Sequence, residues 1–191
     1  MKTEIAFLIV IKLISIKIIK TNSKMIDSQT FLEFIKGRRS IRSFQDKPLK
    51  EKEIEMILEA GRWAPSASNR QPWEFIVIRN KVILEKISKT AFYGKFMKGI
   101  PVAIAIVAKI NTSPKWYLID TSLVSMNMML MAWSLGIGTC WIGAMNREKA
   151  KEIIGLGIKD HLLTVLPFGY VKGEIPEPTS RKPLNKIVNY L

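Results

Sequence analysis

Two residue types on which many catalytic and metal sites depend are nearly absent from this sequence, which has one cysteine, Cys140, and one histidine, His161. A single cysteine forms no intrachain disulfide, and this pair cannot supply the four ligands of an ordinary zinc site. A Ser-His-Asp triad would need His161, but no Gly-x-Ser-x-Gly turn accompanies it, and a Walker A loop is missing as well. These absences leave an enzyme whose chemistry lies in a bound cofactor, or a binding protein.

Acidic residues are scarce beside basic ones. The 191 residues include 30 Lys and Arg against 16 Asp and Glu, a net charge of +14. Such a chain attracts anions: nucleic acid, an acidic membrane face or a phosphorylated small molecule. A nucleic-acid interface would need a larger basic face with interleaved aromatic residues. Because the charge is spread along the chain, we expect no nucleic-acid partner. The length and an apolar share of 48% are typical of one globular domain.

Long hydrophobic runs are missing too. In residues 1–24 the longest apolar run is seven residues, against about 20 needed to span a bilayer. Lys12, Lys17 and Lys20 interrupt what would be a signal-peptide core. Together with Lys24 they lie on one side of a helical wheel, so a membrane-surface helix stays open as an alternative. An intersubunit packing arm is a further alternative. We expect residues 1–24 to be an extension outside the fold, without membrane contact, and residues 25–191 to form one domain.

Hydrophobic periodicity predicts a chain of mixed helices and strands without strict alternation, which indicates an α+β fold. The expected helices cover residues 28–37, 51–62, 81–89, 117–135 and 146–154, and the expected strands 73–78, 101–108, 139–143 and 162–170. Pro167 predicts an edge or a bulge in the last strand. The helix over 117–135 is apolar nearly all round, which predicts burial on every side and so contact with a partner subunit. Prolines keep the C-terminal tail extended.

The densest group of anion donors is Arg38, Arg39, Ser40 and Arg42, three guanidiniums and a hydroxyl within five residues. Guanidinium forks match phosphate oxygens two at a time, which lysine cannot do. The group therefore indicates a phosphate site, with a solvated basic turn as the alternative.

A second group of polar side chains lies in the proline-bounded loop 64–72, which contains Pro65, Ser66 and Asn69. Such donors and acceptors suit the rim of a planar heterocycle, although a structured turn explains them as well. Further along, Gly143 has no Cβ and so lets a flat ring lie close to the backbone. We expect Cys140, in an apolar strand, to be a buried and inert thiol.

Together and in this order, the motifs resemble the FMN-dependent nitroreductase family. The matching segments are Arg-Arg-Ser-Ile-Arg at 38–42, Ala-Pro-Ser-Ala-Ser-Asn-Arg-Gln-Pro-Trp at 64–73, Ser-Leu-Gly-Ile-Gly-Thr-Cys-Trp-Ile-Gly at 134–143 and Arg-Lys-Pro-Leu at 181–184. The resemblance covers about residues 26–191. It implies a central, mainly antiparallel sheet flanked by helices, an extended C-terminal tail, and a homodimer whose interface contains the long helix.

The resemblance also implies two FMN sites at the subunit interface. Arg38, Arg39, Ser40 and Arg42 would hold the phosphate, the ribityl chain and the pyrimidine edge, and Arg181 would add a second phosphate contact. Pro65, Ser66 and Asn69 would reach the ring from the other subunit. Ile142 and Gly143 would lie at the ring, with the Gly143 N–H near flavin N5. We expect no essential catalytic side chain.

The implied activity is that of a cytoplasmic enzyme. Hydride would pass from NAD(P)H through flavin N5 to a nitroaromatic, a quinone or a similar electrophile, in a ping-pong mechanism. A non-catalytic FMN-binding or storage protein is the alternative from another class. Flavin-fragmenting and dehalogenating branches of the same family are further alternatives, since no signature in residues 92–99, the expected covering segment, selects among them.

Overall fold

The computed structural model describes residues 26–191. Helix α2 (Ser28–Gly37) belongs to a separate unit and is described by itself. Asp27 begins it, because its carboxylate accepts hydrogen bonds from both the backbone N–H and the hydroxyl of Thr30, each at 2.9 Å. The rest of the chain, Arg38–Leu191, is the body that contains the sheet.

The body is built on an antiparallel sheet with the strand order β1-β2-β4-β3. Its strands are β1 (Trp73–Ile78), β2 (Val102–Lys109), β3 (Ile137–Thr139) and β4 (Asp160–Tyr170). The alternating side chains of the inner strand β2 enter two separate cores, one on each face of the sheet. The continuous apolar run that predicted this strand is thus explained by burial on both faces.

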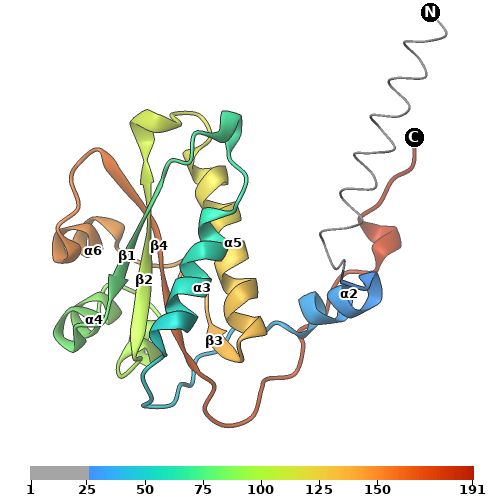
Figure 1. Cartoon of the computed structure of the whole chain (residues 1–191), viewed down its shortest axis with the longest axis horizontal. Helices are drawn as coiled ribbons and strands as arrows, with labels where there is room; N and C mark the ends of the chain where they lie inside the picture. Colours follow the sequence, from blue (N-terminus) through green and yellow to red (C-terminus); the bar gives the residue numbers. More distant parts are fainter. Residues whose placement is uncertain (1–25) are drawn as a thin grey trace, which may run out of the picture. The chain divides into compact units, whose positions relative to one another are not determined.

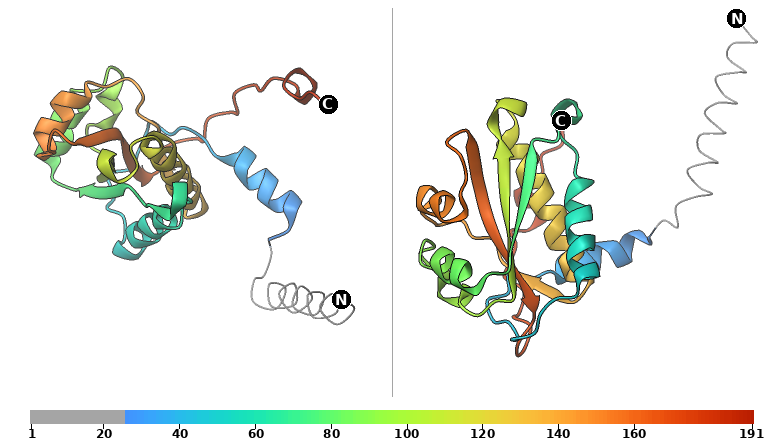
Figure 2. Two further views of the ribbon diagram at one scale, coloured as in Figure 1. Left: turned by 90° about the horizontal axis from the view of Figure 1, so that it is seen from above. Right: turned by 60° about the vertical axis from the view of Figure 1, so that its left-hand side comes forward.

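Helices cover both faces of the sheet (Figures 1 and 2). Helices α3 (Glu51–Arg62) and α5 (Tyr117–Ser134) lie side by side on one face, and α4 (Lys81–Ser88) and α6 (Arg147–Ile154) cover the other. The α+β architecture with an antiparallel sheet flanked by helices is therefore confirmed. Within residues 26–191, none of these helices is long and apolar enough to cross a membrane.

Strand β3 differs from the strand expected at 139–143. It begins at Ile137, directly after Gly136, and already ends at Thr139. Its partner on the outer side is distant in sequence: Ile41 donates its backbone N–H to the Thr139 carbonyl at 2.9 Å. A Cβ on Gly138 would lie 2.7 Å from the Ile41 side chain, so this glycine lets the segment 38–42 lie against the sheet edge.

The expectation of an edge at Pro167 is wrong, because β4 is an inner strand and Pro167 lies opposite Ala103 of β2. On the other side of β4, however, β3 ends with Thr139 opposite Phe168. Among the described residues, Pro167 has no ladder partner on that side, so the missing N–H of proline costs no hydrogen bond there.

A bulge does occur in β4, a few residues earlier. The pairing steps from Ile106 opposite Thr164 to Val107 opposite Leu162, which leaves Leu163 without a partner. The extra residue changes the side of the sheet to which the following side chains point. The bulge lies next to the loop that forms the candidate site.

The long helix α5 is apolar nearly all round, but within one chain only one of its faces is buried. Met128 is fully buried, and it packs so closely on α3 that a Cβ on Gly61 would lie 2.8 Å from its Cγ. On the opposite face, Ile119, Leu123 and Met126 are 53%, 42% and 41% exposed. The apolar stripe formed by these three residues is the part of α5 that this chain leaves uncovered.

Candidate functional site

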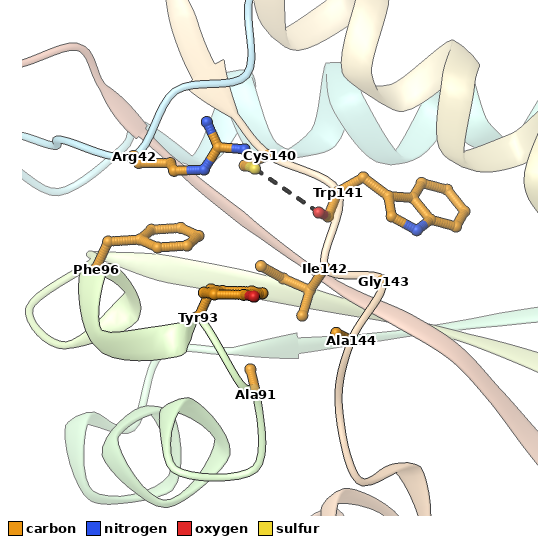
Figure 3. Close-up of a pocket in the computed structure, with 9 residues that line it drawn as sticks. All are labelled: Arg42, Ala91, Tyr93, Phe96, Cys140, Trp141, Ile142, Gly143 and Ala144. Carbon is orange, nitrogen blue, oxygen red and sulfur yellow. Dashed lines mark hydrogen bonds between the residues drawn. The ribbon is translucent and has the colours of Figure 1, made fainter.

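A pocket of about 340 Å³ opens where the chain leaves β3. Its lining residues are Arg42, Ala91, Tyr93, Phe96, Cys140, Trp141, Ile142, Gly143 and Ala144. Figure 3 shows the rings of Tyr93 and Phe96 on one side of it and the loop that carries Gly143 on another. The segment 92–99, expected to be a covering segment, thus supplies aromatic side chains to the pocket wall.

A smaller hollow of about 220 Å³ adjoins the pocket and shares Arg42 with it. Ser40 lines it together with Lys172 and Glu174, which follow β4. Both hollows lie along the segment 40–43, which runs beside the outer edge of β3. A ligand with a flat part and an anionic part would find a place for each along this edge.

The guanidinium of Arg38 is the strongest sign of an anion site. Its Nη1 is buried and has no hydrogen-bond partner among residues 26–191. Burial lowers the pKa of Arg38, and the neighbouring guanidinium of Arg181 lowers it further. In that part of the chain, no carboxylate forms an ion pair with Arg38, Arg42 or Arg181. A bound anion would satisfy the buried donor and offset the repulsion between the guanidiniums.

Arg39 ties this segment to the C-terminal tail. Its Nε donates a hydrogen bond to the carbonyl of Pro176 at 2.9 Å, and its Nη1 donates to the Arg38 carbonyl at 3.1 Å. The tail and the segment 38–42 therefore meet at the same edge of the sheet, as the proximity of the Arg38 and Arg181 charges also indicates.

The loop before β1 is held in an unusual backbone conformation. Three residues of the loop have φ angles in the left-handed region, which residues other than glycine rarely adopt. They are Ser68 at 53°, Asn69 at 52° and Gln71 at 48°. Ser66 accepts the backbone N–H of Gln71 at 2.9 Å and closes the loop on itself. Strain of this kind persists only where the surroundings hold it and is concentrated at functional sites.

Asp120 on α5 helps to keep the loop in this conformation. The residue is only 2% exposed, and its carboxylate accepts hydrogen bonds from the Ala67 backbone N–H at 3.0 Å and the Ser113 hydroxyl at 2.9 Å. Asp120 is not among the site residues expected from the sequence. The available signal was that it is the one charged residue in α5.

The structure brings together one part of the site predicted from the sequence and separates the other. The residues gathered near β3 are Arg38, Arg39, Ser40, Arg42, Ile142, Gly143 and Arg181. Pro65, Ser66 and Asn69 precede β1, which is the opposite edge of the same sheet. Neither of the two hollows is lined by Pro65, Ser66 or Asn69, so the joint role of the two groups stays a prediction that involves a second subunit.

Cys140 lies in the pocket wall rather than inside a strand. It is buried, and its Sγ–H donates to the Trp141 carbonyl at 3.7 Å. Burial raises the pKa of the thiol, although Arg42, Ser40 and Arg38 act in the opposite direction. A protonated thiol is a poor nucleophile. In the described residues, no group of three or more His, Cys, Asp or Glu is placed to hold a metal ion.

Comparison with known proteins supplies the family. Residues 35–92 and 85–170 match the model of the nitroreductase family. The chain belongs to the nitroreductase family. The resemblance seen in the motifs is therefore confirmed.

The relatives in this family include both sequences and solved structures. A Methanothermobacter thermautotrophicus protein with the provisional name NADH dehydrogenase/NAD(P)H nitroreductase is 41% identical over 145 residues, which are 73% of this chain and 76% of the relative. A similarly named structure from Parabacteroides distasonis has a TM-score of 0.80 at 28% identity and covers 85% of this chain and 98% of its own. An FMN-dependent nitroreductase structure from Clostridium difficile has a TM-score of 0.76 at 28% identity and covers 83% and 98%.

Proposed function

We propose that this nitroreductase-family chain binds FMN at the β3 edge and passes hydride from NAD(P)H to an electrophilic acceptor. The observation that carries the proposal is the buried Nη1 of Arg38, which lacks a partner in the described chain. The charge of Arg38 also acts on Cys140, which lines the same pocket as Gly143. Nitroaromatics and quinones are the acceptors that we expect. The names of the relatives, NAD(P)H nitroreductase and FMN-dependent nitroreductase, support the same reaction class.

The residues present fit the phosphate of FMN. Arg38 offers an unpartnered buried donor, and Arg181 adds charge beside it. The hydroxyl of Ser40 lines the adjoining hollow. We assign the phosphate to Arg38, Arg181 and Ser40, with Arg39 holding the tail against them.

The residues present also fit the ring. A Cβ on Gly143 would meet only the indole of Trp141, at 3.7 Å, which is ordinary contact. Its backbone does not need the left-handed region either. Neither packing nor conformation within the chain therefore explains a glycine here, whereas close approach of a flat ring does.

FMN held by these residues would supply the redox chemistry, the transfer of hydride from NAD(P)H to the acceptor. The residues of the protein would bind and orient the flavin and the acceptor. The positive charge of Arg42 near the pyrimidine edge would stabilise the negative charge that the ring gains on reduction. The rings of Tyr93 and Phe96 in the pocket wall would favour planar acceptors.

We further propose a homodimer in which each site is completed by the partner subunit. Each chain would contribute Arg38, Ser40 and Gly143 to one site, and Pro65, Ser66 and Asn69 to the other. The positions of these groups at opposite edges of one sheet support this division. The exposed apolar stripe of α5 offers a surface for the second copy.

The test separates the phosphate from the ring. FMN and riboflavin, which lacks the phosphate, are titrated by flavin fluorescence into wild type, Arg38→Gln and the control Arg79→Gln. Arg79 forms a surface ion pair with Glu51. Arg79→Gln therefore removes one positive charge, as Arg38→Gln does, but away from the pocket. Arg38→Gln should weaken FMN about tenfold or more and riboflavin less than about threefold. A wild-type chain that binds neither flavin would refute the proposal.

A further inference from the structure

The loop between β3 and α6 carries the Gly143 peptide, and side chains from two other elements hold its carbonyl groups. Thr164 of β4 donates its hydroxyl to the Ile142 carbonyl at 3.0 Å. Arg147, the first residue of α6, donates from Nη2 to the Gly143 carbonyl at 3.1 Å. Two consecutive peptide groups of the loop are thus fixed from their carbonyl ends.

The amide end of the same peptide is different. In the described part of the chain, the Gly143 N–H has no hydrogen-bond acceptor. The C=O of Ile142 and the N–H of Gly143 belong to one planar trans peptide, so they point in opposite directions. By holding the carbonyl on the side of β4, Thr164 turns the N–H away from β4. Gly143 itself lines the pocket.

The β4 bulge supports a positioning role for Thr164. The unpaired residue of the bulge, Leu163, directly precedes it. The Leu163 carbonyl is not left free, because Arg147 donates to it from Nε at 3.1 Å while its Nη2 holds Gly143. Bulges occur next to active sites because they re-aim a side chain. The Arg147 guanidinium therefore connects the bulge in β4 to the loop that carries Gly143.

The burial of the Thr164 hydroxyl costs free energy. Thr164 is fully buried in an inner strand, where an apolar side chain would avoid the cost of burying a hydroxyl. Its hydroxyl makes one contact in the described chain, with the Ile142 carbonyl. The Thr164 hydroxyl thus forms its hydrogen bond with the loop rather than with a neighbouring strand.

We propose that Thr164 is a positioning residue that aims the Gly143 N–H into the pocket, at N5 of the bound flavin. The inference rests on the proposed function, because it requires the flavin ring to lie against Gly143. Oxidised flavin presents a lone pair at N5 that accepts an N–H, whereas N5 of reduced flavin carries its own hydrogen. A correctly aimed donor therefore stabilises the oxidised form more than the reduced form.

The experiment measures the dissociation constants of oxidised and reduced FMN, and the midpoint potential, for the full-length protein and three variants. Thr164→Val keeps the shape and removes the hydroxyl, while Thr164→Ser keeps the hydroxyl. The control is Thr121→Val, since Thr121 is equally buried and donates to the Tyr117 carbonyl at 2.6 Å within α5. All of these substitutions are neutral in charge, so none shifts the potential through long-range electrostatics. If Thr164→Val does not fold, Thr164→Ala replaces it.

Thr164→Val should raise the dissociation constant of oxidised FMN about tenfold and that of reduced FMN much less. A tenfold difference between the two forms corresponds to a rise of about 30 mV in the two-electron potential. Thr164→Ser and Thr121→Val should stay within about threefold of wild type. Equal weakening of both forms by Thr164→Val, no weakening, or the same result with Thr164→Ser would overturn the inference. Wild type that binds no FMN would instead overturn the proposed function.

Discussion

At the level of single residues, Gly138 is required by the packing of the fold, whereas Gly143 is explained by the proposed site. A Cβ at position 138 would lie 2.7 Å from Ile41, whereas one at Gly143 would meet nothing closer than 3.7 Å. Gly143→Ala should therefore change the free energy of unfolding by less than about 1 kcal/mol, yet weaken FMN and riboflavin about tenfold or more. Gly138→Ala, the matched change, should cost about 1–3 kcal/mol through overpacking.

Urea unfolding of the apoprotein and flavin titration check both variants. The assignment of the ring to Gly143 fails if Gly143→Ala binds flavin as tightly as wild type does.

The Cys140 thiol offers a prediction about pH. Its pKa is raised, mainly by burial, so less thiolate is present at a given pH than in a free cysteine. Because the thiolate is the reactive form, alkylation by iodoacetamide at pH 8 should be slower than for a model thiol. The rate should climb with pH and fall further when FMN is added, since Cys140 lines the pocket. Rapid alkylation that ignores FMN would place the thiol outside the site.

At the scale of elements, helix α5 has two different apolar faces, and substitutions on each should act differently. Met126→Asp changes the exposed apolar stripe, so it should break the proposed dimer and lower FMN affinity while each chain stays folded. Met128→Asp buries an unpaired carboxylate in the chain's own core and should cost several kcal/mol. Sedimentation and circular dichroism distinguish the two outcomes. A Met126→Asp dimer that binds FMN normally would show that the interface lies elsewhere.

The same elements show what local sequence could and could not predict. The turn residues Asn146 and Gly136 marked the ends of α6 and α5 correctly, because capping and left-handed turns are local effects. The apolar pattern of α5 could not tell which face its own chain buries, since every face is apolar. The end of β3 was also missed, because its outer partner, Ile41, is about a hundred residues away in the sequence.

The candidate site divides in the same way. Arg38, Arg42 and Gly143 could be selected from the sequence, because dense guanidiniums and a glycine in an apolar segment carry a chemical reason. Thr164 could not, and Asp120 gave only the signal of a single charge in α5, because each acts through hydrogen bonds to backbone far along the chain. Supporting residues of this kind become visible only when the fold brings distant segments together.

At the scale of the whole molecule, the predicted extension, residues 1–24, lies outside the described residues. We expect its removal to leave FMN content, dimer and reductase activity within about twofold of the full chain, because the family match begins at residue 35 and all assigned site residues lie beyond it. Absorbance, gel filtration and NAD(P)H oxidation rates of the truncated chain test this. If truncation removes the dimer or the flavin, residues 1–24 form an intersubunit arm.

We propose that this chain is a flavoenzyme that takes hydride from NAD(P)H, rather than a protein that only binds FMN. The most direct measurement is the visible absorption spectrum of the FMN-loaded protein under anaerobic conditions, first with NAD(P)H and then with a nitroaromatic or quinone. We predict one FMN per chain, loss of its visible absorption with NAD(P)H, its return with the acceptor, and parallel lines in double-reciprocal plots of steady-state rates. A bound flavin that keeps its absorption in excess NADH and NADPH would contradict the proposal.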